Sequence, residues 1–254
     1  MIVKKLSWAS ICINSDGTSV LIDPLGSNPK GGSSMAARMG EAHEPIYPLT
    51  NIQSVHAILI THIHPDHFDT EGILETFGED VPIYIPQESA PFAEKAGFKN
   101  VHGADIGDAF VIENIRVFPT YSVDGFGTPQ VAWIVKDDRR TLLHCGDTLW
   151  HGYWWKIEHE HGPIDAACLP VNGPILTIEG LKRQSGIPAC LTPEEAVEAA
   201  AILGAKTWIP IHFRTFHHPP YYVETKDIEA RVKHHSKEKK IDVALLASGE
   251  EIAL

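Results

Sequence analysis

The first part of the chain alternates short apolar runs with polar turn signals. Apolar residues dominate positions 3–8, 10–14 and 19–23, and the last two runs are separated by a turn at Asp16 and Gly17. Asp-Gly between two apolar runs is a strong signal for a tight hairpin. The pattern therefore predicts an antiparallel meander of three strands.

The rest of the chain divides into further strands and helices. The clearest predicted helix covers residues 192–203, with Thr192 as N-cap, Pro193 at the first helical position and Glu195 completing a capping box. Other helices are predicted over residues 70–77, 88–96 and 226–235. Apolar runs predict strands over residues 55–60, 81–85, 110–112, 115–119, 131–136, 141–144, 164–169, 207–211 and 241–247. Two groups of strands, each followed by helices, indicate an α+β fold in which two sheets pack face to face with helices outside.

The length and composition fit one domain. A chain of 254 residues with 43% hydrophobic content can bury a sizeable core. No linker-like tract divides the chain, so we expect a single domain over residues 1–254. Residues 26–50, 171–191 and 213–222 are predicted as long loops, and long ordered loops are usually functional.

Charge and apolar content limit the partners. No apolar stretch approaches the ~20 residues that cross a bilayer, and the N-terminus lacks a signal-peptide core, so we expect a cytoplasmic protein. A formal net charge of −12 disfavours nucleic acid as a partner. The expected partner is a small-molecule substrate, and oligomerisation stays open. The four cysteines form no CxxC pair, so neither a disulfide framework nor a thiolate zinc site is indicated.

One short segment carries most of the candidate chemistry. Residues 61–67 read Thr-His-Ile-His-Pro-Asp-His, directly after the apolar run 57–60. Imidazole and carboxylate are preferred ligands of zinc and also suit iron, nickel and manganese. In an extended loop His62 and His64 project to one side, whereas Asp66 and His67 can face a second point. The segment therefore predicts ligands for two neighbouring metal ions.

The spacing H-x-H-x-D-H over residues 62–67 resembles the signature of the metallo-β-lactamase fold hydrolases. This resemblance implies a four-layer αββα sandwich with a dinuclear metal site at one edge of its two sheets. It also implies that Asp147, in the run Cys-Gly-Asp-Thr, bridges the two metals. His212, after the apolar run 207–211, would be a ligand of the second site.

One ligand expected from the resemblance is replaced. A third histidine of the first site belongs in a run resembling Pro-Ala-x-His-Ser, and residues 118–122 read Phe-Pro-Thr-Tyr-Ser, with Tyr121 in its place. A phenol can ligate a metal once ionised or bind a metal-bound water, but it is a poorer donor than imidazole. One or two divalent ions are therefore both possible, with zinc expected first and manganese, nickel or iron as alternatives. His102, His144 and His151 would substitute only if folding brought them near.

Such a site predicts hydrolysis. A metal can lower the pKa of water enough to supply hydroxide for attack on a carbonyl or phosphorus centre. Asp66 would also orient this water, and Tyr121 is the second candidate catalytic residue. Residues 169–173, 194–196 and 210–213 look most like the branch containing L-ascorbate 6-phosphate lactonase. The predicted substrate is thus a small anionic lactone, ester or phosphoester, with loop cations such as Arg38, Arg183 and Arg214 as candidates to neutralise it.

Three alternatives stay open. A phosphodiesterase or nuclease of the same fold is the first, although the acidic balance argues against a polynucleotide substrate. A diiron redox role is weaker, because the redox branches carry glutamate at the position of His64. The third is a non-catalytic metal-binding protein in which Tyr121 marks a degenerate first site.

Overall fold

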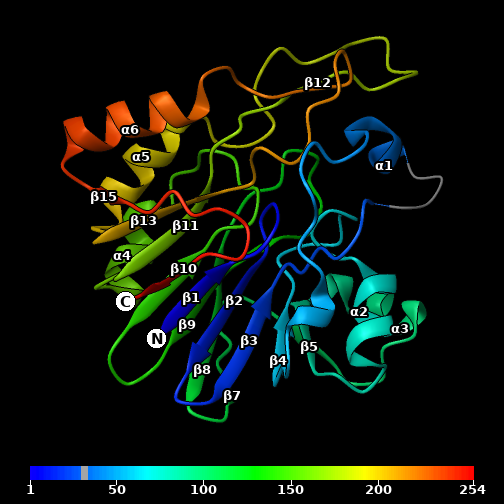
Figure 1. Cartoon of the computed structure of the whole chain (residues 1–254), viewed down its shortest axis with the longest axis vertical. Helices are drawn as coiled ribbons and strands as arrows, with labels where there is room; N and C mark the ends of the chain where they lie inside the picture. The colour runs from blue at the N-terminus through cyan, green and yellow to red at the C-terminus, as the bar shows by residue number, and fades with distance from the viewer. Residues whose placement is uncertain (30–33) are drawn as a thin grey trace.

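A computed structural model describes residues 1–29 and 34–254. Residues 30–33, part of the predicted loop 26–50, lie outside the described residues. The first large sheet is built mainly from the N-terminal half (Figure 1). Its strands in spatial order are β16 (Glu251–Ala253), β1 (Ile2–Lys5), β2 (Ile11–Ser15), β3 (Thr18–Ile22), β4 (Ala57–Leu59), β5 (Ile83–Pro86) and β6 (Val101–Ala104).

The second large sheet follows in the chain. Its strands in spatial order are β15 (Asp242–Val243), β13 (Thr207–Ile211), β11 (Ala166–Pro170), β10 (Thr141–His144), β9 (Val131–Lys136), β8 (Ile115–Tyr121) and β7 (Phe110–Ile112). A separate two-stranded sheet pairs β12 (Ile175–Leu176) with β14 (Tyr222–Val223). It lies beyond the ends of the large sheets, close to α1 (Ser34–Met39) (Figure 1).

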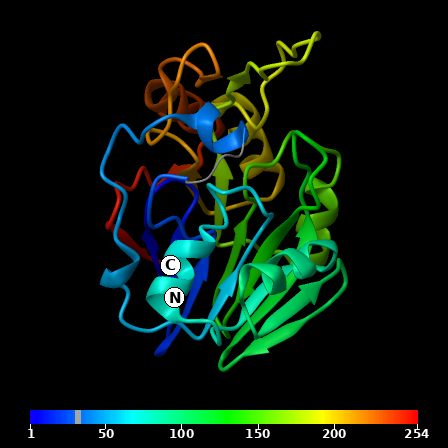
Figure 2. The ribbon, with the colours of Figure 1, turned by 90° about the vertical axis from the view of Figure 1, so that its right-hand side faces the viewer.

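Helices cover the outer faces of both sheets. The helices α2 (Thr70–Phe77) and α3 (Ala90–Ala96) lie against the first sheet, and Figure 2 shows them in front of its strands. The helices α4 (Trp154–His161), α5 (Pro193–Ile202) and α6 (Ile228–Lys239) cover the second sheet. Two 3₁₀ turns, Leu49–Asn51 and Gln87–Ser89, complete the elements. None of the helices in the described ranges is long and apolar enough to cross a membrane.

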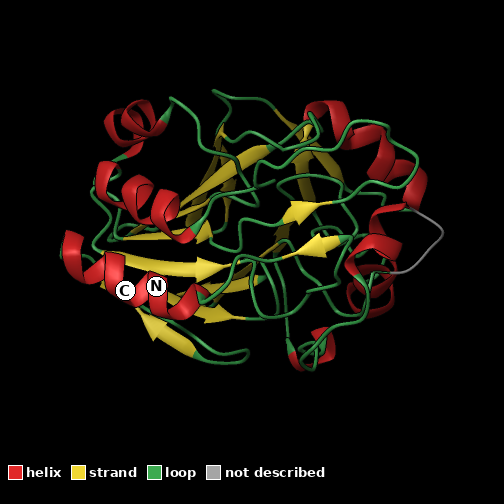
Figure 3. Ribbon diagram, turned by 90° about the horizontal axis from the view of Figure 1, so that it is seen from above, coloured by secondary structure: helices red, strands yellow, loops and turns green. Residues whose placement is uncertain are grey.

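Three apolar cores fit this layering. The central core joins side chains of both sheets, for example Val20 and Ile22 with Val117 and Trp133. The two outer cores join each sheet to its helices. Seen from above, the strands lie in the middle with helices on both sides (Figure 3). The predicted α+β sandwich of the metallo-β-lactamase fold is thus confirmed.

Most local predictions agree with this structure, and the differences have physical causes. The Asp16-Gly17 hairpin forms with positive φ at both residues, and the capping box at Thr192 is present. The predicted strand 3–8 ends at Lys5, because residues 6–10 turn sharply, with the Ser10 amide donating to the Ser7 carbonyl. The predicted strand 241–247 shrinks to β15, and the partner of β1 is instead β16. The tryptophans at 154 and 155 favour a packed helix face over a pocket lining, and helix α4 agrees with this, with Trp154 buried.

Strand direction brings six loops to one end of the sandwich. β3 and β4 run parallel, and β10, β11 and β13 also run parallel to one another. β8 and β10 are both antiparallel to β9, so they share a direction too. The carboxyl ends of these strands meet at one edge, where side chains from distant parts of the chain can converge.

Candidate metal centre

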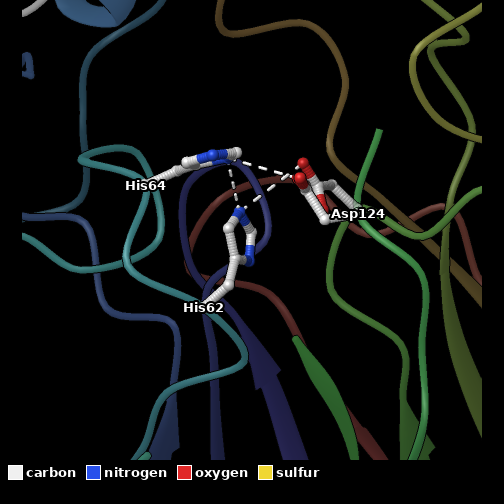
Figure 4. A group of neighbouring side chains, drawn as sticks. His62, His64 and Asp124 are labelled. Atoms are coloured by element: carbon white, nitrogen blue, oxygen red, sulfur yellow. Dashed lines mark hydrogen bonds and ion pairs between the residues drawn. The ribbon is translucent and has the colours of Figure 1, made fainter. Parts of the chain in front are cut away.

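The loop after β4 places its imidazoles at the end of the sandwich. His62 Nε2 lies 2.8 Å from His64 Nδ1 and 3.6 Å from an oxygen of Asp147, which follows β10. Asp147 can approach this closely because Gly146 precedes it with a φ of +63°; a Cβ there would lie 2.8 Å from the Thr61 hydroxyl. Figure 4 shows His62 and His64 facing a carboxylate from a third segment.

That carboxylate belongs to Asp124, which lies three residues beyond the end of β8. Its Oδ1 is 3.6 Å from His64 Nδ1, and its Oδ2 accepts the backbone N–H groups of Phe126 and Thr128. One ligand atom from each of His62, His64, Asp124 and Asp147 lies within 4.8 Å of the others. Asp124 was not predicted from the sequence, since Asp-Gly in a loop usually forms only a turn.

A second cluster lies beside the first. Asp66, His67 and His212 are all buried, and their ligand atoms are also within 4.8 Å of one another. An Asp66 oxygen is 3.4 Å from His67 Nε2 and 3.6 Å from His212 Nε2. The His67 ring centroid is 4.2 Å from that of His62, so the clusters are adjacent. His212 has a φ of 60°, a left-handed backbone that non-glycine residues rarely adopt and that often marks a functional site.

Hydrogen bonds behind the clusters orient two of the imidazoles. The fully buried Asp23, just after β3, accepts His67 Nδ1–H at 2.8 Å and the Thr61 hydroxyl at 2.7 Å. Because the Thr61 hydroxyl donates to Asp23, it can only accept from His62 Nδ1, at 3.0 Å. Both rings then carry a proton on Nδ1 and present the Nε2 lone pair to the clusters.

Polar side chains also contact the outer nitrogens of the remaining two imidazoles, His212 and His64. His212 Nδ1 lies 3.1 Å from the side-chain oxygen of Asn172, an obligate acceptor, so its Nε2 is also left with a lone pair. His64 Nε2 lies 3.0 Å from the Thr128 hydroxyl, which leaves Nδ1 for the cluster. On the second cluster, Trp8 Nε1–H donates to Asp66 Oδ2 at 2.9 Å and fixes that carboxylate.

Burial and the close approach of ionisable groups shift the pKa values in both clusters. Burial and the nearby carboxylates of Asp124 and Asp66 raise the pKa of Asp147 to about 7. Burial lowers the pKa of His62 well below its ordinary value and that of His212 to about 4. Burial also opposes ionisation of Asp66 and His67, but their mutual attraction wins: the pKa of Asp66 falls well below its usual range, and that of His67 rises to about 9.

Several ligand atoms fit a bound cation. Among the described residues, buried His67 Nε2, His212 Nε2, Asp124 Oδ1 and Asp147 Oδ1 have no hydrogen-bond partner. Buried polar atoms are normally paired, and unpaired ones need an explanation such as an ion. His62 Nε2, a lone pair, lies 2.8 Å from His64 Nδ1, which can donate a hydrogen bond to it or, once deprotonated, offer a second lone pair to a cation. Imidazole and carboxylate donors together suit zinc and other divalent transition metals.

The structure does not bring Tyr121 into either cluster. Its hydroxyl accepts a hydrogen bond from Lys156 at 2.5 Å, and its ring stacks on Tyr153 with centroids 4.2 Å apart. The phenol therefore faces helix α4, and the carboxylate of Asp124 is the group that lies with His62, His64 and Asp147 instead.

The other histidines considered as substitutes lie outside the clusters. The His102 ring stacks on Tyr84, His144 Nε2 lies 2.8 Å from the Ala9 carbonyl, and the His151 ring stacks on Trp154. Of the loop cations, Arg214 pairs with Glu229, whereas the Arg38 guanidinium lies 5.4 Å from the centre of the Phe126 ring, beside the first cluster.

Comparison with known proteins places the chain in a family. Residues 18–213 match the Beta-lactamase superfamily domain. A UPF0173 metal-dependent hydrolase of Exiguobacterium sp. is 33% identical over 84% of this chain and 84% of its own length. One of Thermococcus kodakarensis is 28% identical over 99% of both chains. The chain therefore belongs to the β-lactamase superfamily. Within that superfamily it belongs to the UPF0173 metal-dependent hydrolase family.

Solved structures agree with the fold. The isothiocyanate hydrolase from Delia radicum gut bacteria has a TM-score of 0.79 and 20% sequence identity, covering 100% of this chain and 99% of the other. At this level of identity the likeness supports the fold alone.

Proposed function

We propose that this protein is a metal-dependent hydrolase of small metabolites. His62, His64, Asp124 and Asp147 would hold one divalent ion, and Asp66, His67 and His212 the other. Metal ions bound there would supply hydroxide from water at neutral pH and stabilise the charge that develops on the substrate. Zinc is the first candidate by donor type, with manganese, nickel and iron as alternatives.

The observation that carries this proposal is the convergence of unpaired, buried donor atoms on two adjacent points. Hydrogen bonds from His67, His62 and His212 to Asp23, Thr61 and Asn172 orient these imidazoles so that their lone pairs face the clusters. Metal ligands are oriented in this way by outer partners. Asp66, fixed by Trp8, is the carboxylate placed to orient an attacking water. Asp147 belongs to the first cluster, where its carboxylate lies 3.6 Å from His62 Nε2, and the charge of His67 in the second cluster favours its ionisation.

The substrate is proposed to offer an electrophilic carbon or phosphorus centre. A lactone or carboxylic ester is the first choice, because residues 169–173 and 194–196 resemble the lactonase branch, and a phosphoester is the second. The isothiocyanate hydrolase that shares the fold adds an isothiocyanate to the compounds worth assaying. A phosphodiesterase stays the alternative, and the same assay separates it from an esterase.

The test uses metal-free protein reloaded separately with zinc, manganese, nickel or iron. Each form is assayed on a γ-lactone, 4-nitrophenyl acetate, bis(4-nitrophenyl) phosphate and an isothiocyanate. We expect hydrolysis of at least one compound by a loaded form and none by the metal-free form. Absence of hydrolysis in every loaded form would argue for a non-catalytic metal-binding protein.

A pair of histidine variants controls for metal bound elsewhere. His64→Ala removes a ligand of the first cluster and should abolish the metal-dependent rate. His234→Ala removes an exposed histidine of the surface group His234, His235 and Glu238 on α6 and should leave that rate intact. Equal rates in the two variants would contradict the proposed site.

A further inference from the structure

The cavity at the metal centre is small beside its neighbour. About 30 Å³ is free between His64, Asp66, Asp124, Asp147 and His212. A substrate whose electrophilic group lies at the metals therefore finds most of its room in the neighbouring cavity.

A larger cavity opens directly beside it. Its volume is about 340 Å³, within the range of ligand pockets of ~300–1,000 Å³. Phe126, Leu176 and Ala189 line both cavities, so the two lie side by side. The segment 171–191, which forms one wall, lies at the same end of the sandwich as α1 (Figure 1). The substrate can therefore extend from the metal centre into this space.

The walls of the larger cavity are mainly apolar. Leu149, Ile178, Leu181 and Ile187 line it, and Leu181 and Ile187 are 54% and 72% exposed. Apolar side chains gathered around a cavity of ligand size favour an apolar occupant, because its burial removes both surfaces from water.

Two polar lining groups are engaged within the loop itself. The Gln184 amide accepts from the Ile178 N–H and donates to the Ile178 and Leu181 carbonyls, at 2.8–2.9 Å. The Ser185 hydroxyl accepts the Ile187 N–H at 3.1 Å. These side chains hold the wall in shape, and Arg183 is the charged lining residue.

The floor between the two cavities is closely packed. A Cβ on Gly125 would lie 2.7 Å from the Ala189 carbonyl, so glycine allows the two loops to touch. The neighbouring Asp124 and Phe126 then face the metal centre and the apolar cavity. One short loop thus joins a metal ligand to the wall that meets the remainder of the substrate.

From the position of this apolar cavity beside the metal centre we infer that the substrate carries an apolar arm, an alkyl or aryl group of several carbons, on its electrophilic centre. The arm occupies the cavity between Phe126 and Ile187 while the electrophilic centre reaches the metals. The inference rests on the proposed hydrolase function and narrows it: a wholly polar sugar-phosphate lactone would leave this cavity unused.

The first test is a chain-length series of 4-nitrophenyl acetate, butyrate and hexanoate with the metal-loaded protein. Each buried methylene should raise kcat/KM about threefold to fourfold until the cavity is full. Ile187→Asp should flatten this rise by lowering the hexanoate rate most. Val111→Asp is the matched control, since Val111 is 70% exposed on β7, outside the cavity, and this variant should keep the wild-type rise.

A binding measurement separates this inference from the proposed function. The uncharged fluorophore N-phenyl-1-naphthylamine should bind the wild type and Val111→Asp, be displaced by 1-hexanol, and bind Ile187→Asp weakly. Fluorophore binding without any hydrolysis would refute the hydrolase but leave the cavity an apolar binding site. Hydrolysis with a flat chain-length series and no fluorophore binding would overturn the apolar arm. The apolar arm would also be overturned if the wild type formed a dimer that Ile187→Asp dissociates while the chain-length series stays the same. The cavity would then be a contact between two copies of the chain.

Discussion

Replacing Asp23 with asparagine should weaken metal binding although no proposed ligand is replaced. Asp23 is fully buried and accepts three hydrogen bonds, from the Thr61 N–H, the Thr61 hydroxyl and His67 Nδ1. An asparagine oxygen can keep the bond from the Thr61 N–H. Its NH₂ group would then face the hydroxyl and the imidazole, and it can only donate.

That exchange moves the proton of the neutral His67 ring from Nδ1 to Nε2. To accept from the new NH₂ group, Nδ1 must lose its proton, and the neutral ring then carries the proton on Nε2, which faces the metal cluster. The lone pair needed for coordination is lost unless the ring turns or the bond breaks. Removal of such an outer partner typically costs ~10–100-fold in metal affinity, which is about 1.4–2.7 kcal/mol.

The assay is a zinc competition between the protein and a chromophoric chelator, with the folded state confirmed by circular dichroism. The control is Asp69→Asn, the same change in a carboxylate that accepts the Gly26 and Gly72 N–H groups near α2 but lies outside both clusters. Zinc affinity should fall for Asp23→Asn and stay constant for Asp69→Asn. A folded Asp23→Asn variant within about twofold of wild-type affinity would refute the reasoning on imidazole orientation.

Three further predictions follow from the same structure. Asp124→Asn should lower the metal affinity of one site at least ~10-fold, whereas Tyr121→Phe should change neither metal affinity nor stoichiometry. If Tyr121→Phe lowered the affinity and Asp124→Asn did not, the phenol and not Asp124 would be the ligand. Chelation should lower the melting temperature, because metal at about 100 times its Kd adds about 2.7 kcal/mol of stability; an unchanged melting temperature would mean that no ion binds the fold. Burial lowers the pKa of Lys5 from 10.5 to about 7, so the unfolded chain binds the extra proton and stability should rise with pH between those values, by up to about 1.4 kcal/mol per pH unit. The difference in urea unfolding free energy between wild type and Lys5→Met measures this slope, and a flat difference would contradict it.

The sequence predicted those parts of the site that depend on local order. The motif at residues 62–67 follows a strand directly, and Asp147 and His212 each come just after an apolar run. These residues could therefore be predicted as candidate ligands from the local sequence. The hairpin at Asp16 and Gly17 could also be predicted from the local sequence, because both residues tolerate the positive φ that the turn needs.

The rest depends on packing between segments far apart in the chain. Asp124 lies three residues beyond Tyr121, the end of β8, and the fold of the loop brings its carboxylate to the first cluster. Trp8 reaches Asp66 across 58 positions of sequence, and Asn172 reaches His212 across 40. No local pattern distinguishes such residues from an ordinary strand end or turn.

The most direct test of the metal-dependent hydrolase is a titration of metal-free protein in which bound metal and hydrolysis rate are measured on the same samples. The two adjacent clusters predict a background rate without metal, a rise as ions bind, and a plateau when both clusters are filled. In Asp124→Asn the rise should require more metal than in the wild type. A full rate in metal-free protein, or a rate that does not change while both clusters fill, would contradict the proposed hydrolase.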